Sequence, residues 1–165
     1  MLSAYRELAA DREAQGIPAL PLTAEQTQAL TELLQQPPAG EDEVLLHLLS
    51  ERIPPGVDEA AYVKAGFLSA VATGETSCPL IDRQHAIRLL GDMHGGYNIS
   101  TLIGLLDDAE LGVAAADELR HTLLVFDAFH DVVERANNGS TNAQTVLKSW
   151  ADGEWFTRQT EVPES

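Results

Sequence analysis

One histidine of this chain stands among carboxylic acids at spacings that could hold a divalent metal ion. His130 is preceded by Asp127 and followed by Asp131 and Glu134. On a helix, side chains three and four residues apart lie on the same face, so an imidazole and carboxylate oxygens could converge there. Both groups are ligands for divalent metals. Asp127, His130 and Asp131 are therefore the candidate metal ligands of the sequence.

An ordinary exposed helix face explains the same acids more simply. Phe126 and Phe129 are expected to define the buried face of this segment, which turns the neighbouring carboxylates toward water. Acids at three- and four-residue spacing are common on such faces. The favoured interpretation assigns no metal site to the chain, and a small metal-binding protein remains an alternative.

No arrangement for covalent or acid–base catalysis stands out in the sequence. The single cysteine, Cys78, precedes Pro79, and no histidine with an orienting partner lies near it in the sequence. A thiol without such neighbours is more often inert than nucleophilic. The other histidines are isolated from potential partners: His47, His85, His94 and His121. We therefore predict no catalytic and no cofactor-binding residues.

A glycine pair, Gly95-Gly96, directly precedes a predicted helix over residues 99–106. Glycines before a helix can form a phosphate-binding loop, since they permit positive φ and close backbone approach. However, the segment lacks the lysine and the serine or threonine of a Walker loop, and no strand precedes it. Tight packing between helices is the favoured explanation.

The charge of the chain restricts its partners. Lys and Arg total 10 against 26 Asp and Glu, which gives a formal net charge of −16. Such a field repels phosphate backbones, so we expect no direct nucleic-acid binding by this chain alone, while basic protein partners fit. No apolar run approaches the length of a membrane span and no secretion signal is evident, so a cytoplasmic location is expected.

The elements that would position these residues are predicted to be helices throughout. The central one lies between Ile53 and Gly74, where Asp58 can cap its start and Gly74 can end it. Its alanines and Leu68 form one apolar face, and Tyr62 and other apolar residues extend that face, so we expect burial on more than one side.

Similar signals delimit the other helices. Thr23 with Gln26 predicts a capping box, and Asp82 and Ser140 or Thr141 are expected to begin later helices. One helix is predicted over 123–136, and Asp152 is expected to cap a last turn. Roughly nine short helices joined by Pro- or Gly-marked turns predict an all-α fold of stacked antiparallel helical hairpins. We expect one domain over residues 1–158 and a polar tail over 159–165.

Several runs along nearly the whole chain resemble the N-terminal region of the aconitase B family. That family comprises bacterial aconitate hydratases of the citric acid cycle, which also act as 2-methylisocitrate dehydratases. The runs are PPAGEDE (37–43), RIPPGVDEAAYVKAGFL (52–68), GGYNI (95–99), LLDDAEL (105–111), HTLLVFD (121–127) and SWADGEWF (149–156).

The resemblance implies a HEAT-like α-superhelical domain associated with protein contact, self-association and access to the active site. In the family this domain is also linked to iron-responsive regulation of messenger RNA. The family's catalytic residues and its 4Fe–4S cluster belong to later domains. Such a cluster needs three cysteine thiolates, and this chain offers only Cys78. By itself it cannot be an aconitase.

We therefore expect a non-catalytic interaction module that contacts itself or the remaining aconitase domains. The candidate interaction surface is aromatic: Trp150, Trp155 and Phe156. A C-terminal helix that closes the core is the competing, favoured interpretation of these residues. A free-standing acidic helical adaptor that acts in trans is the alternative function.

Overall fold

The computed structural model describes residues 1–122 and 128–153, and all secondary structure in these ranges is helical, as predicted. The helices are α1 (Leu2–Ala14), α2 (Ala24–Gln35), α3 (Asp42–Glu51), α4 (Glu59–Thr73), α5 (Arg83–Gly91), α6 (Ile99–Gly104), α7 (Gly112–Arg120), α8 (Phe129–Asn137) and α9 (Thr141–Ala151). Each of them is too short or too polar to cross a lipid bilayer.

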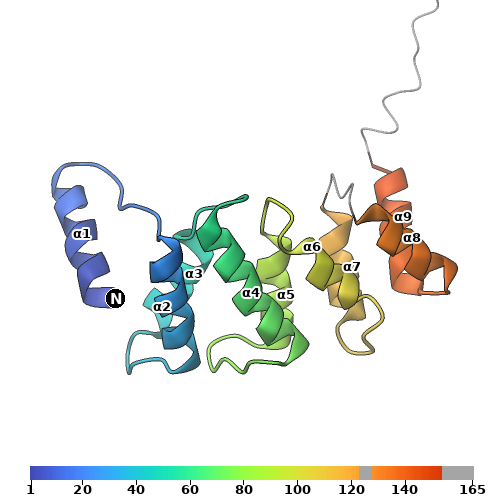
Figure 1. Ribbon diagram of the computed structural model, residues 1–165, viewed down its shortest axis with the longest axis horizontal. Helices are drawn as coiled ribbons and strands as arrows, with labels where there is room; N and C mark the ends of the chain where they lie inside the picture. Colours follow the sequence, from blue (N-terminus) through green and yellow to red (C-terminus); the bar gives the residue numbers. More distant parts are fainter. Residues whose placement is uncertain (123–127, 154–165) are drawn as a thin grey trace, which may run out of the picture.

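The helices form an elongated row of pairs (Figure 1). Consecutive helices pack against each other in the pairs α2–α3, α4–α5, α6–α7 and α8–α9. The pairs are joined by contacts of α2 with α4, α5 with α7 and α7 with α9. A chain of pairs that each touch their neighbours is the arrangement expected of a helical stack.

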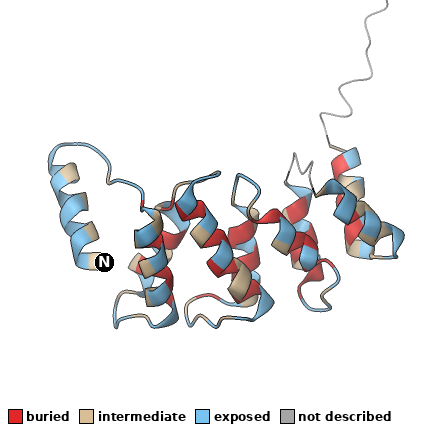
Figure 2. Cartoon of the chain, viewed as in Figure 1, coloured by how far each residue is buried: buried red, intermediate tan, exposed pale blue. Residues whose placement is uncertain are grey.

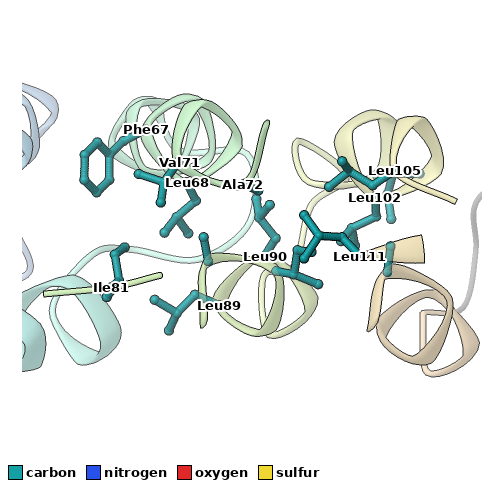
Figure 3. Close-up of a cluster of buried hydrophobic side chains, with 14 of the residues drawn as sticks. Phe67, Leu68, Val71, Ala72, Ile81, Leu89, Leu90, Leu102, Leu105 and Leu111 are labelled. Carbon is teal, nitrogen blue, oxygen red and sulfur yellow. The ribbon is translucent and has the colours of Figure 1, made fainter. Parts of the chain in front are cut away.

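Helix α4 lies near the middle of this row and is deeply buried, as its composition predicts. Asp58 caps it by accepting a hydrogen bond of 2.8 Å from the Ala60 backbone N–H, and Gly74 ends it with a φ of 83°. Figure 3 shows how its apolar side chains face the neighbouring helices. The labelled residues of this cluster are Phe67, Leu68, Val71, Ala72, Ile81, Leu89, Leu90, Leu102, Leu105 and Leu111.

Two residues of α4 have an exposure that does not follow from their residue type. Tyr62, predicted to extend the buried surface, is 66% exposed, whereas Lys64 is only 8% exposed. Lys64 lies three residues after Ala61 and four before Leu68, so it shares the helix face of these buried residues. Burial lowers the pKa of Lys64, and the negative charges of Asp92 and Glu51 oppose that shift.

Three further predicted helix starts are confirmed by capping hydrogen bonds. Thr23 accepts a bond of 3.2 Å from the Gln26 N–H, and the Gln26 side chain accepts one of 3.0 Å from the Thr23 N–H. Asp82 accepts a bond of 2.7 Å from the His85 N–H. Ser140 caps α9 in the same way through the Ala143 N–H.

The C-terminal region departs from the predicted pattern. Among the described residues, the helix expected over 123–136 begins only at Phe129, with Ala128 as its N-cap. Phe129 is 43% exposed, so the prediction that it marks the buried face was wrong. The buried residue of α8 is Val132. Asp152 is the C-cap of α9, and the further turn that it is expected to cap lies outside the described residues. Residues 123–127 and 154–165 lie outside the described ranges, so the expected boundary between domain and tail at residue 158 is untested.

Helix α1 stands at one end of the row and holds no buried residue (Figures 1 and 2). It is attached by partly buried Leu2 and Tyr5, which pack against the core, and by two polar contacts. Arg6 pairs with Glu41, and the Arg52 guanidinium donates a bond of 3.1 Å to the Tyr5 hydroxyl. Elsewhere the buried residues run through the interior of the stack (Figure 2). α1 is therefore the least firmly packed helix.

Candidate functional site

Two adjoining hollows lie along the side of the stack formed by α2, α4, α6 and α8. The first, of about 470 Å³, is lined by Gln28, Thr31, Tyr62, Val63, Ala65, Gly66, Phe67, Ser69, Ala70, Thr76, Tyr97, Ser100 and Thr101. The second, of about 490 Å³, is lined by Ser100, Ile103, Gly104, Asp107, Asp131, Glu134, Arg135, Asn138 and Ser140. Because Ser100 lines both, we treat them as one feature, the α4–α8 groove.

The half of the groove over α4 carries no charged side chain. Tyr62 and Tyr97 stand at its edge with their rings edge to face and their centroids 5.3 Å apart. The small residues of α4 that line this half are Ala65, Gly66 and Ala70. The hydroxyls of Ser69 and Thr101 lie 2.7 Å apart and tie α4 to α6. This half therefore offers aromatic, small apolar and uncharged polar groups to a ligand.

The glycine pair before α6 positions Tyr97. Gly95 and Gly96 both have positive φ, 99° and 94°. A Cβ on Gly95 would lie within 2.7 Å of Gly56 Cα and closer still to the Gly56 carbonyl. The predicted close backbone approach is thus present, but it joins two connecting loops instead of two helices. The Tyr97 hydroxyl donates a 3.2 Å bond to the carbonyl of Val57, in the same loop as Gly56.

The half of the groove beside α8 is acidic. Arg135 pairs with Asp107, and hydrogen bonds from Ser140 and then Arg135 lower the pKa of Asp107. Asp131 and Glu134 also line this half, and within the described residues no cation pairs with either. This half therefore presents two carboxylates for a cation to pair with.

The structure only partly assembles the candidate metal ligands. Asp131 and Glu134 line the same hollow, whereas His130 is not among its lining residues, and its ring lies 6.0 Å from that of Phe129. Asp127 lies outside the described residues. In residues 1–122 and 128–153, no three His, Cys, Asp or Glu side chains are grouped closely enough to hold a metal ion.

Trp150, a candidate surface residue, lies in the core of the last helix pair. It is 8% exposed, and its indole N–H donates a bond of 2.9 Å to the carbonyl of Leu119 in α7. A buried indole with its donor satisfied is a packing element. Phe129 stacks on its ring at 6.2 Å and is the exposed aromatic residue there. Trp155 and Phe156, the other candidates, lie outside the described residues.

Comparison with known proteins finds similarity over almost the full sequence. A family model described as the aconitate B N-terminal domain matches residues 4–156. This chain belongs to that family. The resemblance found in the sequence runs is thereby confirmed.

Relatives of this aconitate B N-terminal domain are much longer proteins. The chain is 64% identical to aconitate hydratase B of Pseudomonas aeruginosa over 164 residues, which are 99% of the chain and 19% of that protein. It is 59% identical to the Escherichia coli K12 protein of that name and 40% identical to that of Helicobacter pylori J99. Each match covers 94% of the chain and 18% of the relative. The chain thus spans about a fifth of the relatives' length.

The residues of this aconitate B N-terminal domain do not fit an aconitase-type iron–sulfur cluster. Such a cluster is held by cysteine thiolates, and Cys78 is the single cysteine of the sequence. Its thiol is half-buried and donates a bond of 3.2 Å to the carbonyl of Leu34. Cys78 is therefore engaged in the packing of the loop before α5 against α2.

Sequence reasoning missed the main residues of the groove. Tyr62 was assigned to the core, and neither Tyr97 nor Gly66 was singled out. One signal was available: Gly66 interrupts the interior of an otherwise good helix, and such a glycine often has a packing or binding reason. The approach of α4 to α6 has no comparable local signal.

Proposed function

We propose that this chain is a non-catalytic interaction domain of an aconitate hydratase B, whose whole polypeptide interconverts citrate and isocitrate in the bacterial cytoplasm. The family match and the shared name of the relatives support the assignment to such a protein. The observation that carries the interaction role is the α4–α8 groove on a stack that we infer to be HEAT-like. Stacked helical pairs commonly bind proteins along such extended surfaces.

The proposal divides the work between this domain and the rest of the polypeptide. A 4Fe–4S cluster held elsewhere would supply an open iron as the Lewis acid for the substrate. This domain would contribute to self-association or to the route by which substrate reaches the active site. With a net charge of −16 it would meet protein surfaces and would not bind nucleic acid directly.

A reconstitution experiment tests the proposal. Aconitate hydratase B of P. aeruginosa, lacking the region that aligns with this chain, is assayed for citrate–isocitrate conversion with and without the purified chain. We expect no conversion by the chain alone, and a changed rate or a larger assembly when the two parts are mixed. Unchanged rate and unchanged mass would instead support a separate adaptor that acts in trans on another protein.

A further inference from the structure

We propose that the α4–α8 groove binds an amphipathic segment of the same aconitate hydratase B polypeptide, from the part outside this domain. The segment places an apolar side chain against Tyr62 and Tyr97 and a lysine or arginine against Asp131 and Glu134. This inference rests on the proposed function, since it requires that the chain be joined to such a polypeptide.

The first argument concerns two helical glycines that line the groove. A Cβ on Gly66 or on Gly104 would meet no heavy atom within 4 Å. Neither glycine has a positive φ, so neither conformation nor internal packing requires the missing side chain. Glycine in a helix interior is less stable than alanine, and Gly66 lies in the middle of α4. An occupant whose backbone approaches α4 closely explains why this position carries no side chain.

The second argument is the exposed aromatic edge. Tyr62 is 66% exposed although it lies on the most buried helix of the domain. Tyr97 is held beside it by the Gly95–Gly56 contact and the bond from its hydroxyl to Val57. Tyrosines fixed in one orientation lose little conformational entropy on binding and make good anchors for apolar groups.

The third argument is charge. Thirteen residues line the uncharged half without a single acid or base, although 22% of the chain is charged. In the other half, Arg135 is occupied by Asp107, while Asp131 and Glu134 have no cation among the described residues. An occupant with an apolar group at one end and a basic group at the other is complementary to this pattern.

The cost of association favours a tethered occupant over a separate protein. Stable complexes between separate proteins bury about 1,600 Å², and free partners lose translational and rotational freedom when they associate. A segment of the same polypeptide avoids most of that loss, since its effective concentration reaches the millimolar range. About four-fifths of each relative's length lies outside the region matched by this chain.

The test uses full-length aconitate hydratase B of P. aeruginosa with this chain in place of its own aligned region. Gly66→Trp fills the uncharged half, and Glu134→Lys reverses a charge in the acidic half. Glu7→Lys makes the same charge change on α1, where Glu7 is exposed and belongs to no ion pair among the described residues. Helix content by circular dichroism establishes that each variant is folded.

Hydrogen–deuterium exchange of residues 93–104 is the primary readout. We expect exchange to become roughly tenfold faster in Gly66→Trp and in Glu134→Lys, which corresponds to a tenfold loss of occupancy, and to stay unchanged in Glu7→Lys. Unchanged exchange in both groove variants would overturn the inference. A Gly66→Trp variant that fails to fold leaves Glu134→Lys to decide.

Carbodiimide cross-linking of a mixture of ¹⁴N- and ¹⁵N-labelled protein identifies the source of the occupant. Cross-links from Asp131 or Glu134 to lysines of the same label are expected. Cross-links between labels would assign the groove to a second copy and overturn the inference. If the swapped enzyme converts citrate while exchange is unaffected by the groove variants, only the groove inference fails. A swapped enzyme without activity, together with no effect in the reconstitution, would refute the proposed function itself.

Discussion

Replacing Gly95 and Gly96 separately by alanine would measure how much the loop–loop contact stabilises the domain. Both positions have positive φ, so alanine is strained at each by about 1 kcal/mol. Only at Gly95 does the added Cβ collide with another segment, the backbone of Gly56, whereas a Cβ on Gly96 meets nothing within 4 Å. Backbone atoms cannot rotate away as a side chain can, so the loops must separate.

The magnitude follows from what the separation breaks. The hydrogen bond from Tyr97 to Val57 contributes about 1 kcal/mol, and the edge contact of Tyr97 with Tyr62 contributes about 1 kcal/mol more. Gly95→Ala should therefore lower the free energy of unfolding by about 3 kcal/mol, against about 1 kcal/mol for Gly96→Ala. For a chain of this length, these values correspond to decreases in Tm of about 9 °C and about 3 °C.

Urea unfolding followed by far-UV circular dichroism measures both values, and thermal melting provides the second estimate. Tyr97→Phe serves as a control, since it removes only the hydroxyl bond and should cost about 1 kcal/mol. Equal losses for Gly95→Ala and Gly96→Ala, within about 0.5 kcal/mol, would show that the close approach to Gly56 does not constrain the domain.

Three further substitutions test the capping and the buried charges. Thr23→Ala should lower the free energy of unfolding, measured in urea, by about 1 kcal/mol. Thr23→Ser retains the capping hydroxyl and should lose much less stability. Equal losses in the two variants would contradict a role for the hydroxyl. Lys64→Met should raise the urea midpoint at pH 7, because burial lowers the pKa of Lys64. Between the lowered pKa of native Lys64 and 10.5, the unfolded chain binds more protons than the native chain, so the native chain gains stability as pH rises through this window. The stability advantage of Lys64→Met over the native chain should therefore narrow as pH rises. An advantage that is independent of pH would argue against a lowered pKa of Lys64. Burial raises the pKa of Glu118, so the native chain loses stability as pH rises through that pKa, and Glu118→Gln should be more stable at pH 7 but equal below pH 4.5. A Glu118→Gln midpoint that matches the native chain at pH 7 would contradict the shift.

Local signals in the sequence predicted the helix boundaries well. Asp58 and Gly74 delimit α4 as expected, because a capping carboxylate and a left-handed glycine act within a few residues of themselves. The capping box of Thr23 is correct for the same reason. In contrast, the burial predicted for Phe129 is wrong, since it depends on how the last helix pair packs and not on the sequence neighbours of Phe129.

Burial of single side chains was less predictable than helix position. The apolar ring of Tyr62 favours a core position, yet this residue is 66% exposed. Lys64 is buried although it is charged, because it lies on the same helix face as Ala61 and Leu68. The groove could not be predicted, because Tyr62 and Ser100 lie on helices of different pairs and line one hollow only in the folded stack. How two helix pairs pack leaves no local signal in either segment.

The packing of each helix on near neighbours has a consequence for how the protein is made. The substantial helix–helix contacts join elements no more than two places apart in chain order. Folds built from such local contacts form quickly, and N-terminal domains fold first during synthesis. In its long relatives this domain is made early, so its helix pairs can close one after another as they leave the ribosome. We expect the groove to be complete before most of such a long polypeptide has been translated.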